Sequence, residues 1–266
     1  MSRIQKSFSA LKENEKTLVA FITAGDPDLE TTKTMFKVIE DNGADIIEIG
    51  VPFSDPLADG PVIQASAYRS LKNGTTLVKI IQMVKEIRQS SDLPIVLMTS
   101  FNPVFAYGEE AFVRDAVEAG VDGVIIPDLP PEEAGEFICL AEDKNLDIIF
   151  LLAPTSTLDR IKMVGSLSRG FIYYVSLTGT TGVKGSLSKD LSEKTALIKN
   201  NVEQPVLVGF GISGPEQAKQ AALASDGVII GSAIVKMIAE CQDSQDRQSK
   251  VGEFVAGVKK AISNLG

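Results

Sequence analysis

The chain has 266 residues, of which 44% are hydrophobic and 23% charged, so it is large enough to build a substantial core. Its formal charge of −9 argues against a nucleic-acid surface or an anionic membrane as partner. Since there is no apolar run of about 18 residues, no signal peptide and no cysteine besides Cys139 and Cys241, we expect a cytoplasmic protein. Histidine is absent, which excludes Ser-His and Cys-His catalysis and most zinc sites. No metal is therefore expected, and carboxylates must do most of any acid–base chemistry.

Short β-branched runs alternate with amphipathic stretches along the chain. A helical stretch near residues 4–14 comes first, and further helical patterns lie between the apolar runs, at 28–42, 75–89, 109–119 and 215–224. The runs are nearly continuous in apolar residues, as strands buried on both faces are. These eight strand candidates span residues 17–24, 45–50, 94–100, 122–127, 147–153, 171–176, 205–211 and 226–231.

Three of the strand candidates begin with a similar sequence. "NGADIIEIG", "AGVDGVIIP" and "ASDGVIIG" each place a small residue and an aspartate before an apolar strand. Eight strands that alternate with helices in one undivided chain predict a parallel sheet, closed as a (β/α)8 TIM barrel in a single domain of residues 1–266. An extra N-terminal helix would cover the barrel floor, and a short extra helix would follow strand eight. An open doubly wound sheet is the alternative.

A glutamate stands inside the second apolar strand candidate. Alternation along a strand places Glu48 on the face opposite Ile47 and Ile49, near the end of the strand where barrel active sites lie. A structural ion pair is one interpretation of such an acid. The interpretation that its position favours is a general acid–base group whose pKa is tuned by apolar surroundings.

Two loops that follow strand candidates are long, residues 51–61 and residues 177–189. In the first, Asp55 stands directly before a proline and suits a turn, so Asp59 is the better candidate to face a pocket. The second is rich in glycine and small polar residues. It is either a disordered surface loop or a lid that closes over a substrate.

A glycine-rich motif follows the seventh strand candidate. "VGFGISGPE" contains the G-x-G-x-x-G pattern of a dinucleotide site, but the acid expected about 20 residues later is missing. We therefore favour a phosphate site formed by the loops after strands seven and eight. Gly231 and Ser232 in "GSAIVKMI" would offer free helix N–H groups to an anion. Glycines that serve only tight turns are the other interpretation.

The motifs "FITAGDPD", "IEIGVPFSDPLADGP", "VDGVIIPDLP", "VGFGIS" and "GSAIVK" together resemble the tryptophan synthase alpha subunit family over residues 21–235. The resemblance implies a TIM barrel that cleaves indole-3-glycerol phosphate to indole and glyceraldehyde 3-phosphate, in the last stage of L-tryptophan biosynthesis. It also implies no cofactor in this chain. The partner that it implies is a beta subunit that carries pyridoxal phosphate, in an alpha2beta2 heterotetramer.

The resemblance also assigns roles to individual residues. The catalytic residues it implies are Glu48, Asp59 and Tyr173. The contacts to the indole ring that it implies are Phe21, Leu97, Ile125, Thr181 and Ile229. The phosphate site that it implies consists of Gly182, Phe210, Gly211, Gly231 and Ser232.

The chain departs from the family pattern at two places. It reads "TGTTG" where a valine often precedes the second threonine, and "TSFNP" where many relatives carry tyrosines. Both departures bear on lid closure or on the partner contact. Three other functions stay open: a stand-alone indole-3-glycerol-phosphate lyase, a barrel that acts on another phosphosugar, and a pseudoenzyme that only regulates a partner. The apolar wall argues against the second, and the retained carboxylates argue against the third.

Overall fold

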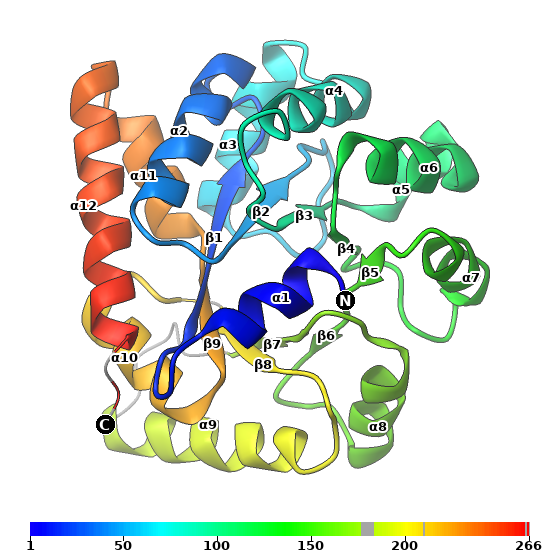
Figure 1. Ribbon diagram of the computed structural model, residues 1–266, viewed down its shortest axis with the longest axis vertical. Coiled ribbons are helices and arrows are strands. Elements are labelled where there is room, and N and C mark those ends of the chain that lie inside the picture. The colour runs from blue at the N-terminus through cyan, green and yellow to red at the C-terminus, as the bar shows by residue number, and fades with distance from the viewer. Residues whose placement is uncertain (177–183, 210, 264, 266) are drawn as a thin grey trace.

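The computed structural model of the chain describes residues 1–176, 184–209, 211–263 and 265. Its strands form one parallel sheet that curls around a central axis, with the helices other than the first around the outside (Figure 1). The strands follow one another around the sheet in the order β5-β4-β3-β2-β1-β9-β8-β7-β6. Their bounds are β1 (Thr17–Thr23), β2 (Ile46–Gly50), β3 (Ile95–Met98), β4 (Gly123–Ile125), β5 (Asp147–Ile148), β6 (Leu151–Leu152), β7 (Ile172–Val175), β8 (Val206–Gly209) and β9 (Gly227–Ile230).

The sheet closes on itself because β5 and β6 are two parts of the same barrel strand. β5 pairs with β4, and β6 pairs with β7. Between them, the Ile149 N–H donates to the Val124 carbonyl at 3.0 Å, while the Phe150 carbonyl accepts from Tyr173 N–H at 3.2 Å. The fifth strand thus joins the two ends of the row. The predicted eight-stranded barrel is confirmed, and the open doubly wound sheet is excluded.

Helices connect successive strands, and two of them confirm the predicted additions to the barrel. α1 lies across the centre of the barrel in Figure 1, and α11 directly follows β9. Helices α3 and α5, in the loops after β2 and β3, were not predicted. The bounds are α1 (Arg3–Ala10), α2 (Leu29–Asp41), α3 (Pro61–Lys72), α4 (Leu77–Ile87), α5 (Phe101–Tyr107), α6 (Glu109–Ala119), α7 (Gly135–Asp143), α8 (Leu158–Leu167), α9 (Lys184–Lys199), α10 (Pro215–Ala224), α11 (Ser232–Glu240) and α12 (Ser244–Ile262).

The core has two layers on the two faces of the sheet. Every barrel strand contributes one inward residue to an interior cluster, which α1 completes from the floor with Ile4 and Phe8. That cluster contains Ile4, Val19, Ile46, Val96, Ile125, Ile149, Phe171, Leu207 and Ile229. A second, larger cluster fills the space between the strands and the outer helices, and Ile47 and Ile49 belong to it. Strands with apolar side chains on both faces therefore build both layers at once.

The repeated aspartate before a strand has a structural explanation at the barrel floor. In each of the three repeats, the carboxylate accepts an N–H from the neighbouring strand and pairs with a cation. The N–H contacts are Leu18 to Asp45 (2.7 Å), Ile95 to Asp122 (2.8 Å) and Val206 to Asp226 (2.9 Å). The cations are Lys259, Arg88 and Lys199, in the same order. The repeated aspartate in the sequence thus marks the N-terminal ends of the strands, which form the floor of the barrel.

None of the helices in the described ranges combines the length and the apolar character that a membrane crossing requires.

Candidate active site

Glu48 lies inside the barrel near the C-terminal end of β2. Its Cα pairs with Phe21 on β1 and with Val96 on β3. The residue is 1% exposed, and its Oε2 atom has no hydrogen-bond partner among the described residues. Burial first, and then the nearby charge of Asp59, raise the pKa of Glu48 to about 8. The carboxyl group is therefore held in its neutral form at pH 7, which suits a proton donor.

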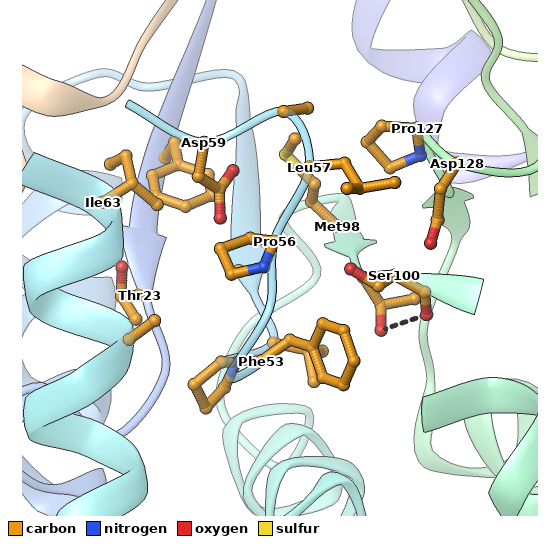
Figure 2. Close-up of a pocket in the computed structure, with 17 residues that line it drawn as sticks. Thr23, Phe53, Pro56, Leu57, Asp59, Ile63, Met98, Ser100, Pro127 and Asp128 are labelled. Atoms are coloured by element: carbon orange, nitrogen blue, oxygen red, sulfur yellow. Dashed lines mark hydrogen bonds between the residues drawn. The ribbon is translucent and has the colours of Figure 1, made fainter. Parts of the chain in front are cut away.

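Asp59 approaches from the loop between β2 and α3. It lines a cavity of about 290 Å3, which Figure 2 shows with Thr23 and Ile63 on the same side as the Asp59 carboxylate. Burial raises the pKa of Asp59. Asp55, four residues earlier, is exposed and does not line this cavity. The geometry therefore favours Asp59 over Asp55, as the sequence did.

Tyr173 on β7 belongs to the same electrostatic environment as the two carboxylates. Burial, followed by the charges of Glu48 and Asp59, raises the pKa of its hydroxyl well above the usual value. The ring occupies space above Gly209 on β8, where a Cβ atom would lie 2.5 Å from the Tyr173 hydroxyl. The barrel thus brings Tyr173 to two carboxyl groups that are far from it in the sequence, and Gly209 leaves room for its ring.

The apolar residues expected around an indole ring are only partly brought together. Phe21 lines the cavity, and Ile125 and Ile229 belong to the barrel interior. Leu97 is not where the expectation requires it, because it lies in the cluster between the sheet and the outer helices. Alternation along β3 turns the next residue, Met98, to the cavity instead. Thr181 lies outside the described residues.

Sequence reasoning missed several residues that line the cavity. Met98 is the last residue of β3, while Ser100 and Asp128 follow β3 and β4, and Figure 2 shows Ser100 and Asp128 on the side of the cavity opposite Asp59. Asp128 also accepts the Phe101 N–H at 2.8 Å, at the start of α5. Met98 and Ser100 stand at the end of the third strand candidate, and Asp128 directly follows the fourth. These positions were a signal that could have found them, because the C-terminal ends of the strands form the active-site end of a barrel.

The expected phosphate site lies where β8 and β9 end side by side. Gly209 pairs with Ile229 in the register of the two strands, and Gly211 and Gly231 each follow two residues later. Gly231 is the N-cap of α11, and Ser232 is the first residue of that helix. The first turn of a helix has N–H groups without intrahelical partners, and these attract anions. A Cβ atom on Gly231 would lie 3.2 Å from Phe21, so this helix end reaches the cavity wall.

Two of the expected phosphate contacts, Gly182 and Phe210, lie outside the described residues. Gly211 is exposed and has φ +74°, a left-handed conformation that glycine adopts without strain. Within the described ranges, no cluster of acidic or cysteine side chains is arranged to hold a metal ion.

The fold and the site define a (β/α)8 barrel in which two carboxyl groups, those of Glu48 and Asp59, lie close enough to interact at the C-terminal end of the strands. The family model described as "Tryptophan synthase alpha chain" matches residues 8–263. The tryptophan synthase alpha chain of Geotalea uraniireducens is 53% identical over 100% of both chains. That of Geobacter sulfurreducens is 51% identical, covering 99% of this chain and 100% of the relative. The chain belongs to the tryptophan synthase alpha chain family.

Solved structures agree with this assignment. The tryptophan synthase alpha subunit of Legionella pneumophila superposes with a TM-score of 0.92 at 37% identity, over 100% of both chains. A chain of the tryptophan synthase complex from Pyrococcus furiosus gives a TM-score of 0.83 at 35% identity, over 92% of this chain and 98% of that one. Alpha chains of this family are lyases that cleave indole-3-glycerol phosphate and carry no cofactor of their own.

Proposed function

We propose that Glu48 and Asp59 together carry the cleavage of indole-3-glycerol phosphate in this chain, and that residues 1–266 act as one domain. One observation supports this proposal above all. A fully buried glutamate with an unpartnered oxygen and a pKa raised to about 8 lies within electrostatic reach of a second carboxylate on a cavity wall. Two carboxylates with separated pKa values are the usual means of acid and base chemistry at one pH.

The reaction is a retro-aldol cleavage with balanced proton transfers. A proton is added to C3 of the indole ring, which leaves a positive charge on the ring. The hydroxyl group on the adjacent glycerol carbon loses its proton as the bond between that carbon and C3 breaks. The bond electrons return to the ring, so that indole and glyceraldehyde 3-phosphate are released. One group must therefore donate a proton, one must accept a proton, and a negative charge must stabilise the cationic ring.

The two carboxyl groups meet these demands in different ways. Glu48, neutral at pH 7, donates the proton to C3 and then, as an anion, accepts the hydroxyl proton. Asp59 acts as an anion that accepts a hydrogen bond from the ring N–H and stabilises the developing positive charge. Tyr173 lies beside both and holds the reacting part of the substrate in place.

The remaining residues position the substrate on either side of the breaking bond. Phe21, Ile125 and Ile229 supply an apolar wall for the ring, and we place Met98 there in preference to Leu97. At the other end, the first turn of α11, with Gly231 and Ser232, accepts the phosphate group. The further phosphate contacts expected of Gly182, Phe210 and Gly211, and the expected ring contact of Thr181, stay predictions.

The chain acts with a tryptophan synthase beta subunit, in an alpha2beta2 assembly whose pyridoxal phosphate belongs to the beta subunit. Exposed apolar side chains provide a surface for that partner: Leu57, which lines the cavity, is 84% exposed, and Phe105, in the helix α5 that follows β3, is 67% exposed. Direct transfer would keep indole, which is small and apolar, from escaping into water. Both cysteines are unpaired, which supports a reducing cytoplasm as the place of action.

An assay of the purified chain on indole-3-glycerol phosphate tests the proposal. We expect release of indole that rises severalfold or more when a beta subunit is added. The variant Asp59→Asn keeps the shape of the side chain and removes its charge, and it should lower the cleavage rate by about 10²-fold or more. A variant with wild-type cleavage would remove Asp59 from the mechanism. Full activity without any complex in sedimentation would favour the stand-alone lyase.

A further inference from the structure

One face of helix α3 is fastened to the loop that follows β1. Ser66, Arg69, Ser70 and Asn73 share this face, because spacings of three and four residues return to the same side of a helix. All four contact the segment of residues 23–27. The contacts are Ser66 with Thr23 (2.7 Å), Ser70 Oγ to the Ala24 carbonyl (2.6 Å), Asn73 Nδ2 to the Pro27 carbonyl (2.6 Å) and Arg69 with Asp26.

The ion pair between Arg69 and Asp26 is the strongest of these contacts. Arg69 Nε donates to Oδ1 of Asp26 at 2.8 Å, and Arg69 Nη2 donates to Oδ2 at 2.7 Å. The Asp26 side chain is 3% exposed. A two-pronged contact of this kind fixes orientation as well as distance. Together with the other three contacts it holds α3 against the end of β1, and it does so outside the cavity, which Arg69 does not line.

Asp59 depends on α3 for its position. Among the described residues its carboxylate has no hydrogen-bond partner, and its carbonyl accepts a hydrogen bond from Gln64 of α3 at 2.7 Å. Only Gly60, the N-cap, separates Asp59 from the first residue of the helix. Any shift of α3 along β1 is thus passed directly to Asp59. Glu48, in contrast, is held by the sheet itself and does not depend on α3.

We propose that Arg69 is a positioning residue of this enzyme, which acts through Asp59 by fixing α3 against the loop after β1. The inference rests on the proposed role of Asp59. A misplacement of about 1 Å costs about 10²-fold in rate. Lysine keeps the charge of arginine but cannot make both contacts in one plane. We therefore expect Arg69→Lys to lower kcat by about tenfold or more, with a smaller change in KM.

A double-mutant cycle tests this inference. The cleavage rate is measured in single turnovers with enzyme in excess, for wild type, Arg69→Lys, Asp59→Asn and the double variant. If Arg69 acts through Asp59, its substitution has no further effect once Asp59 is asparagine. Arg88→Lys is the matched control, because Arg88 also pairs with a buried aspartate, Asp122, but does so at the barrel floor, away from the cavity. Its effect on the rate should be small and the same in both backgrounds.

The outcomes separate the two proposals. If Asp59→Asn cleaves as fast as wild type, the proposed function fails and this inference fails with it. If Asp59→Asn is slow but Arg69→Lys lowers the rate by the same factor in both backgrounds, only this inference is overturned. Circular dichroism shows whether Arg69→Lys folds. If it does not, Asn73→Ala removes a more exposed contact from the same face and enters the cycle in its place, with a smaller loss expected in the wild-type background alone.

Discussion

Replacing Glu48 by glutamine should stabilise the protein increasingly as the pH rises, while it removes catalysis. In the folded chain, burial first and the charge of Asp59 second raise the pKa of Glu48 from 4.5 to about 8. In the unfolded chain the carboxyl group has its ordinary pKa. Between these two values the folded state therefore holds a proton that the unfolded state has released. The free energy of unfolding is therefore undiminished at a pH below the pKa of the unfolded state, and it falls as the pH rises towards the pKa of the folded state.

The size of this effect follows from the two pKa values. Each pH unit between them corresponds to 1.36 kcal/mol, so the span from 4.5 to about 8 corresponds to about 5 kcal/mol. Glutamine has nearly the same shape and no proton to release. We therefore expect Glu48→Gln to exceed wild type in free energy of unfolding by about 5 kcal/mol near pH 9, and by very little near pH 4. Cleavage should fall by about 10²–10⁴-fold, the range for a lost general acid–base group.

Urea denaturation at about pH 5, 7 and 9 measures this difference directly, with indole release assayed on the same samples. Glu136→Gln is a suitable control, since Glu136 is an exposed glutamate in α7 and lies outside the barrel interior. A stability difference between Glu48→Gln and wild type that stays constant from pH 5 to 9 would show that the folded state does not hold the proton. A variant that retains more than about a tenth of wild-type cleavage would show that Glu48 is not the proton donor.

Three further substitutions have expected outcomes. Gly231→Asp places a carboxylate at the N-terminus of α11, where it repels an anion. Calorimetry should therefore show that the variant binds glycerol phosphate about tenfold or more weakly, whereas the control Gly135→Asp, in open space on α7, should bind it as wild type does. Gly50→Ala drives a methyl group into the ring of Phe21, and urea denaturation should show a loss of about 1–3 kcal/mol; an unaffected variant would mean that the ring moves aside freely. Asp122→Ala leaves the largely buried Arg88 guanidinium without its carboxylate partner, so urea denaturation should show a loss of about 3–5 kcal/mol in the free energy of unfolding. A loss below about 1 kcal/mol would mean that this ion pair does little for stability at the barrel floor.

The positions of the strands and their closure into a barrel could be predicted from the sequence, because the apolar runs that mark the strands are local features of the chain. Strands buried on both faces must be apolar throughout, so they stand out along the chain whatever their partners are. Glu48 could be recognised for the same reason, since a single acid in such a run is conspicuous. Helix α3 could not be predicted as easily, because its buried face carries Ser66 and Ser70 and lacks the apolar stripe that marks a helix.

Leu97 shows that a prediction from sequence can be wrong by a single residue. It is as apolar as Met98 and stands next to it, but alternation along β3 sends the two side chains to opposite faces of the sheet. A motif match that is uncertain by one residue therefore cannot decide which of them reaches the cavity. Only the pairing of β3 with its neighbours settles the face, because register in a sheet has a period of two.

The sequence by itself determined the barrel, the family and the residue types available for catalysis, because each of these depends on order along one chain. Only the tertiary structure decided that Glu48, Asp59 and Tyr173 share one electrostatic environment, since they come from β2, the following loop and β7. The raised pKa of Glu48 is likewise a property of the tertiary structure. It arises from loss of contact with water and from a neighbouring charge, and neither exists until the barrel has closed around the side chain.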